Sequence, residues 1–255
     1  TRLLQKTYPQ YVADWTELAD DGYVLMTSSY ASSDGWLWQP PTDNSVAERY
    51  ISTVITAVRE LEKIKLPQEL IEELQLQPFV AREFGLDDGI DQIIADADIR
   101  RRLIDNYQKL LPNQLNINKR RCQAIIELLE KRDELIDISV RAKNFAKQTE
   151  DCFNHSDVRS DNLAFNPQTG ELKLVDWNWA SCASQGSGAT EFLVDMARHG
   201  HDVTPWLGEL NTEMLASFVG FFLTRSLKPP LKPGDNLRQM QALSATVAYD
   251  LLRSM

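Results

Sequence analysis

Three oxygen-bearing side chains in the second half of the chain have types and spacing suited to phosphoryl transfer. Asp157 and Asn162 are five residues apart, and Asp176 follows fourteen residues after Asn162. Transfer of a phosphoryl group from ATP needs a carboxylate that takes the proton of the acceptor hydroxyl, and it needs two ligands for Mg²⁺. One Asn and two Asp side chains can supply those three functions.

The elements around these residues are predicted to be short strands. Apolar residues alternate with polar ones at 152–155, 163–165 and 172–175, and the turn-forming residues 166–170 are expected to close a hairpin between the last two. The candidate chemistry therefore belongs to this hairpin and to the loop before it. Active-site loops are commonly held by a rigid scaffold.

The rest of the chain is predicted to be mainly helical. Helical spacing begins at Ser45, where Ser45 and Glu48 are expected to form a capping box, and continues to about residue 65. Before it, an Asp-Gly turn at 21–22 predicts a hairpin of residues 11–18 and 23–27, followed by a linker. Further helices are expected at 67–76, 91–111, 118–149 with a break near 132–134, 190–199, 210–225 and at the C-terminal end.

The composition favours a globular protein and argues against some classes of partner. The 255 residues are 43% hydrophobic and 25% charged, which predicts a folded globular chain. A net charge of −10 argues against a general nucleic-acid binder and is typical of a soluble protein. The longest apolar run, 215–223, is too short to span a membrane. Three cysteines without a CxxC pair favour reduced thiols and a cytoplasmic location.

Two segments resemble a known family. The run HSDVRSDNLAF, with LKLVDWNWAS after it, is similar to the catalytic and metal-binding segments of the aminoglycoside phosphotransferase family, whose members have a protein-kinase-like fold. The resemblance implies an α+β protein with a mainly helical large lobe, a small catalytic β-hairpin and a remnant of the N-terminal β lobe. It also implies a kinase that transfers the γ-phosphate of ATP to a small-molecule hydroxyl.

Roles follow from the resemblance residue by residue. Asp157 is expected to be the catalytic base, and Asn162 and Asp176 are expected to bind Mg²⁺. His155 is expected to hydrogen-bond the loop backbone. Arg159 is expected to meet a phosphate or a neighbouring carboxylate, and Asp195 to steady the catalytic loop from a following helix.

The N-terminal part is where the resemblance is incomplete. Residues 1–27 resemble the end of the small lobe, 28–41 the hinge and 42–255 the large lobe. The expected contacts to ATP, or to another nucleoside triphosphate, are Met26, Thr27, Ser28, Ser29 and Tyr30. A glycine-rich loop and a strand Lys are not recognisable. We therefore expect an N-terminally truncated kinase, with both features encoded upstream and with weak ATP binding by the chain itself.

The acceptor is not specified by the motif, because families that carry it phosphorylate aminoglycosides, macrolides, choline, amino alcohols and sugars. The acidic balance slightly favours a cationic acceptor. Neither a nucleic acid nor a membrane is expected as a partner.

Three other interpretations stay open. The HxD segment could be a loop cap with Asp176 as a turn former, or the chain could be a kinase-like binding module without turnover. A metallohydrolase could use His155 and Asp157 with His199 and His201, although residues two apart do not share a helix face. Trp36 and Trp38 could line a pocket or pack in the core.

Overall fold

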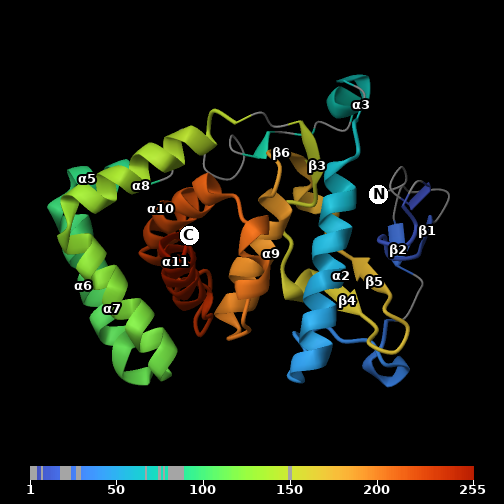
Figure 1. Ribbon diagram of the computed structural model, residues 1–255, viewed down its shortest axis with the longest axis horizontal. Coiled ribbons are helices and arrows are strands. Elements are labelled where there is room, and N and C mark those ends of the chain that lie inside the picture. Colours follow the sequence, from blue (N-terminus) through green and yellow to red (C-terminus); the bar gives the residue numbers. More distant parts are fainter. Residues whose placement is uncertain are drawn as a thin grey trace. The chain divides into compact units, whose positions relative to one another are not determined.

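In the computed structural model the chain divides into two compact units, each described here by itself (Figure 1). The first unit comprises Thr1–Leu76 and Asp151–His201, and the second comprises Gln77–Glu150 and Asp202–Met255. The structure describes residues 5–6, 8–17, 24–26, 30–66, 68–73, 76, 78–79, 89–148 and 151–255.

Three two-stranded antiparallel sheets lie in the described part of the first unit. They pair β1 (Trp15–Glu17) with β2 (Val24–Met26), β3 (Cys152–Asn154) with β6 (Ser181–Ala183), and β4 (Leu163–Phe165) with β5 (Leu172–Leu174). The two predicted hairpin pairings are confirmed, and the Asp-Gly turn of the first lies outside the described residues. Strand β6 was not predicted, since three small residues carry no strand pattern.

Both edges of the β4–β5 hairpin are covered by other segments of the chain. Leu37 exchanges two backbone hydrogen bonds with Phe165 of β4, at 2.8 and 3.0 Å. On the other side Val12 forms a parallel bridge with Leu174 of β5, where the Leu174 N–H donates to the Tyr11 carbonyl at 2.7 Å. The hairpin is therefore fixed by neighbours far away in sequence, which compensates for strands of only three residues.

The turn of this hairpin follows from its residue types. The Asn166 side-chain oxygen accepts hydrogen bonds from the Gln168 and Thr169 amides, at 2.9 and 3.3 Å. Gly170 has a φ of +78°, which side-chain-bearing residues rarely adopt. The Asn-to-Gly segment thus sets the register of β4 against β5.

Helix α2 (Asn44–Glu62) is the long helix of the first unit, and its buried face includes Tyr50, Ile51 and Val54. The predicted capping box is wrong. Asp43 is the N-cap and accepts from the Val46 amide at 3.0 Å, while the Ser45 hydroxyl donates to Asp43. The earlier carboxylate takes the cap because its backbone is extended at φ −75° and ψ 126°.

Helix α2 contacts β3 and helix α9 (Ser187–Arg198). The first unit also contains α3 (Gln68–Glu73) and the short 3₁₀ segments η1 (Ser32–Asp34), η3 (Ser160–Asn162) and η4 (Trp177–Trp179). Trp36 packs edge-on against Tyr30, with ring centroids 4.8 Å apart, in a cluster with Ala13 and Ala164. Burial of Trp36 to 8% exposure favours the packing interpretation over pocket lining.

The second unit is helical throughout its described part. Its elements are α5 (Ile90–Ala95), α6 (Ala97–Leu110), η2 (Leu111–Asn113), α7 (Asn116–Glu130), α8 (Arg132–Phe145), η5 (Thr204–Glu209), α10 (Thr212–Ser226) and α11 (Leu237–Arg253). The predicted single helix at 91–111 is wrong, because Asp96 interrupts it and caps α6. The predicted break in the next helix is confirmed and falls at Lys131.

Helices dominate the described chain and the sheets are small, so the predicted α+β class is confirmed at this level. None of the helices in the described ranges has the length and apolar character that crossing a membrane requires.

Candidate functional site

The loop from β3 to β4 carries two of the predicted residues in direct contact. The Asn162 side-chain amide donates to the Asp157 carbonyl at 2.9 Å and to the Asp157 carboxylate at 2.8 Å. Asn162 is buried, whereas the Asp157 side chain keeps 19% of its surface exposed. Since its Nδ2 is directed at Asp157, the Oδ1 of Asn162 is left to accept from, or bind to, another group.

The β4–β5 register brings Asp176 to the same end of the hairpin. Leu163 pairs with Leu174, and one step further the Val175 N–H donates to the Asn162 carbonyl at 3.0 Å. Asp176 follows directly and is exposed to solvent. Asp176 therefore follows the strand at the same end of the hairpin as Asn162, and its charge acts on Asp157.

Both loops of this site contain a strained residue. Ser156 and Asp176 have φ values of +61° and +59°, and they are the non-glycine residues with positive φ in the described chain. A left-handed conformation costs about 1 kcal/mol or more for a residue with a side chain, and such strain concentrates at functional sites. The Ser156 hydroxyl is bonded to the Ser181 hydroxyl of β6, which helps to hold the first turn.

Arg159 contacts two carboxylates of the loop. Its Nη1 lies 3.1 Å from the Asp157 carboxylate, and its Nε and Nη2 lie 3.0 and 3.1 Å from the two oxygens of Asp161. The two-pronged pairing fixes the plane of the guanidinium group. Asp161 was not singled out from the sequence, because an exposed Asp in a polar loop carries no distinguishing pattern.

His155 joins the β3–β4 loop to the strand that leads to Asp176. Its Nε2 lies 2.8 Å from the Val175 carbonyl, which can only accept, so Nε2 carries the proton. The ring is fully buried and lies 4.6 Å from the Trp177 ring. Burial lowers the pKa of His155 to about 4, and its Nδ1 has no hydrogen-bond partner in the described chain. The imidazole is neutral at neutral pH.

Two carboxylates of helix α9 hold the loop from the other side. Asp195, 4% exposed, accepts from the Ser160 N–H at 2.9 Å and pairs with Arg198. One turn earlier on the same face, Glu191 accepts from the Val158 N–H at 3.1 Å. Glu191 was missed from the sequence, although its spacing of four from Asp195 is a signal that could have found it.

The pKa values shift in opposite directions at the half-buried Asp157 of the loop and at the buried Asp195 of α9. Burial raises the pKa of Asp157 above its ordinary value; Arg159 and Asn162 oppose this, whereas the charges of Asp161 and Asp176 add to it. For Asp195, burial is outweighed by Arg198 and by the Ser160 hydrogen bonds, so its pKa lies below the ordinary value. Asp157 therefore has the more basic carboxylate, and Asp195 stays ionised as a positioning group.

Comparisons of the sequence with models of known protein families and with curated proteins found no match. The function therefore has to be inferred from the geometry of these residues.

The residues at the end of the hairpin fit a hard divalent cation by their chemistry. Asn162 and Asp176 offer oxygen donors. Arg159 pairs with Asp157 and Asp161, and the charge of Asp176 also acts on Asp157, so the local charge is negative. In the described ranges, no three His, Cys, Asp or Glu side chains form a group that could hold a metal ion. A site here would need oxygens from a bound phosphate or from water. The Asn178 amide already donates to Asp176 at 2.6 Å.

The predicted nucleotide contacts are only partly described. Thr27, Ser28 and Ser29 lie outside the described residues, and the Met26 backbone pairs with Trp15. Tyr30 is 7% exposed; its hydroxyl accepts from the Asp14 N–H at 2.9 Å, and its carbonyl accepts from Trp38 at 2.7 Å. The polar groups of Tyr30 are thus engaged within the first unit.

The histidines of the hydrolase interpretation do not form a shared site. His199 lies 3.7 Å from Asp195 and 3.1 Å from Arg198, whereas His155 is bonded to Val175. Among the described residues, no three His, Cys, Asp or Glu side chains are grouped so that they could hold a metal ion. The hydrolase interpretation therefore has no support.

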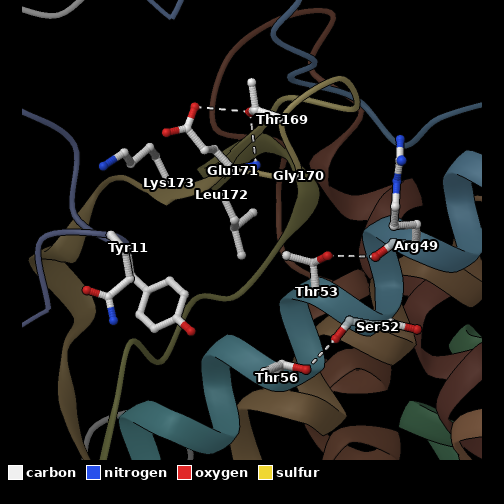
Figure 2. A pocket seen from close by; sticks show the side chains of 11 residues that line it. Tyr11, Arg49, Ser52, Thr53, Thr56, Thr169, Gly170, Glu171, Leu172 and Lys173 are labelled. Atoms are coloured by element: carbon white, nitrogen blue, oxygen red, sulfur yellow. Dashed lines mark hydrogen bonds between the residues drawn. The ribbon is translucent and has the colours of Figure 1, made fainter.

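Figure 2 shows a hollow of about 480 Å³ between α2, the β4–β5 hairpin and Tyr11, whose lining does not include Asp157, Asn162 or Asp176. Most of its polar groups are already bonded: the Thr53 and Thr56 hydroxyls donate to backbone carbonyls of α2, and Thr169 donates to Glu171. Tyr11 is bonded to Glu60 and Lys173 to the Pro9 carbonyl. The Tyr11–Glu60 and Lys173–Pro9 contacts join separate segments of the first unit around this hollow.

Proposed function

We propose that this chain carries the acceptor-binding and metal-binding half of an ATP-dependent phosphotransferase of the kinase-like type. One observation supports it best. Asn162 donates hydrogen bonds to Asp157, and its carbonyl accepts from Val175 at the open end of the β4–β5 hairpin, directly before Asp176. These are the residue types that phosphoryl transfer to a hydroxyl needs at one point. The α+β class is compatible with this proposal.

In the proposed reaction Asp157 accepts the proton of the acceptor hydroxyl. Its pKa is raised by burial, so its carboxylate binds that proton more readily than an exposed Asp would. The contacts from Asn162 and Arg159 fix the direction of the carboxylate. Such positioning is the larger part of what a protein contributes to phosphoryl transfer.

Asn162 and Asp176 are the residues that would hold Mg²⁺. When bound, Mg²⁺ neutralises charge on the phosphates of the nucleotide. The proposed acceptor is a small molecule with a hydroxyl group, and the carboxylates around Asp157 favour a cationic one.

The test is consumption of ATP by the protein, with a panel of amino alcohols, aminoglycosides, macrolides and sugars as acceptors. Asp157→Asn should lower acceptor-dependent turnover at least about 100-fold, because the base is lost while the size of the side chain is kept. The matched control is Asp133→Asn, which removes one exposed carboxylate of α8 and should leave turnover unchanged.

Two results would contradict the proposal. Equal turnover in Asp157→Asn and the wild type would remove the assigned role of Asp157. Mg²⁺-dependent ATP binding without turnover on any acceptor would instead favour a binding module.

A further inference from the structure

A second hollow of the first unit, of about 560 Å³, opens beside the C-terminal end of α2. Its lining comprises Arg59, Glu62, Lys63, Lys65, Cys152 and Gln185. These residues come from α2 and the segment after it, from β3, and from the segment before α9, and α2 contacts both β3 and α9 (Figure 1). The volume is in the range of sites for small metabolites.

The charge of this hollow is opposite to that of the whole protein. The chain carries a net charge of −10, yet three cations and a single carboxylate line the hollow. That carboxylate, Glu62, accepts from the N–H of Gly186 at 2.9 Å, and Gly186 is the N-cap of α9. A carboxylate at a helix N-terminus interacts with the positive end of the helix dipole, so it offsets the neighbouring cations less.

The ion pair at the rim compensates only weakly. Lys65 lies 2.8 Å from Asp151, and the two side chains are 65% and 58% exposed. Exposed pairs of this kind contribute little and are screened by salt. The lining therefore keeps an excess of positive charge.

We propose that this hollow is a binding site for a small organic anion that carries phosphate or carboxylate groups, separate from the Asp157 site. The Lys63 and Lys65 ammonium groups and the Arg59 guanidinium attract the anion. Binding is non-covalent. Burial raises the pKa of the Cys152 thiol to about 11, so the sulfur stays protonated at neutral pH.

The test is calorimetric titration of the chain with inorganic pyrophosphate in EDTA, which excludes metal-bridged binding at Asp176. Lys63→Gln together with Lys65→Gln should weaken binding about fivefold to thirtyfold. The matched control removes the same two charges elsewhere, by Lys119→Gln together with Lys173→Gln, and should bind within about twofold of the wild type. Raising the salt concentration should weaken wild-type binding.

The two lysine pairs decide the question. The proposal is overturned if the wild type does not bind pyrophosphate at low salt. It is equally overturned if both lysine pairs lose the same affinity, because pyrophosphate would then respond only to net charge.

Discussion

At His155 a single hydrogen bond and complete burial determine the protonation state of the ring. The bond to the Val175 carbonyl keeps the proton on Nε2, and burial lowers the pKa of the imidazole from 6.5 to about 4. Protonation would place a charge in a buried site without solvent, so acid should destabilise the folded state, although the hydrogen bond to Val175 opposes this effect.

The pH dependence of stability follows from this shift. Between pH 6.5 and about 4 the unfolded chain binds a proton that the folded chain does not, so the free energy of unfolding falls as the pH falls through this range. Between pH 7 and pH 5 the contribution of His155 should be about 2 kcal/mol.

Urea unfolding at pH 7 and pH 5 measures the decrease in the free energy of unfolding. The decrease should be smaller in His155→Gln than in the wild type. His199 and His201, whose pKa values are also lowered by burial, provide the same background in both proteins. An identical fall in both would contradict the prediction.

At this scale the spacing in the sequence identified two residues that are in contact, while the chemistry assigned to them stays a prediction. Asp157 and Asn162 were chosen by type and separation, and they are in contact. Glu191 and the Asn178–Asp176 bond were not foreseen, because a single carboxylate or amide gains meaning only when its partner is known.

Among the elements, α9 holds the β3–β4 loop through two carboxylates, and we expect them to differ in their effect on stability. Asp195→Ala would leave the buried Ser160 N–H and Arg198 without their acceptor, and we expect it to lower the free energy of unfolding by about 3 kcal/mol. Glu191→Gln keeps an oxygen for the Val158 N–H and should cost less than about 1 kcal/mol. Urea unfolding measures the free energy of unfolding of both variants. Equal losses would contradict the larger contribution that we assign to the buried Asp195.

The packing of α9 on β3 also depends on one glycine. In Gly188→Ala the new Cβ would meet Asn154 Oδ1 at 2.8 Å, so we expect a loss of about 1–3 kcal/mol. Gly208→Ala is the matched control, since nothing lies within 4 Å of its added Cβ, and it should be close to neutral. Thermal unfolding measures both, and a neutral Gly188→Ala would mean that β3 and α9 are not closely packed.

Element boundaries were predicted less well than element types. The helix at 91–111 was expected to be continuous, but Asp96 prefers to cap α6 with its side chain, and the chain turns there. Asp43 displaces Ser45 as N-cap of α2 for a similar reason. Local competition between side chain and backbone for the same N–H groups determines such ends, and apolar periodicity does not report it.

Over the whole molecule, the three thiols report on the two units separately. Cys122 lies in the second unit, Cys152 and Cys182 lie in the first, and all three are free and buried. In the folded protein Cys122, which has no exposed surface, should react with a thiol reagent at least about 100-fold more slowly than in urea, because reaction requires opening of the second unit. Cys152 lines the hollow beside α2 and should be less protected. Mass spectrometry of labelled peptides measures each site, and rapid labelling of Cys122 without urea would contradict its burial.

The division into two units could not be read from the sequence. The first unit combines segments 1–76 and 151–201, so its core forms between residues such as Tyr50 and Phe192, whose rings lie 5.5 Å apart. Hydrophobic periodicity along the chain indicates each helix or strand, but it does not indicate which distant elements share a core.

The ladder between β4 and β5 has one further consequence. Asn162 and Asp176 belong to the open end of the hairpin, and the Asn166-to-Gly170 turn belongs to the closed end. Residues inserted at that tip would lengthen the fourteen-residue interval without moving either side chain, as long as the Leu163–Leu174 pairing is kept. The interval of fourteen residues between Asn162 and Asp176 therefore depends on the length of one turn. The positions of the two residues depend on the pairing of β4 with β5.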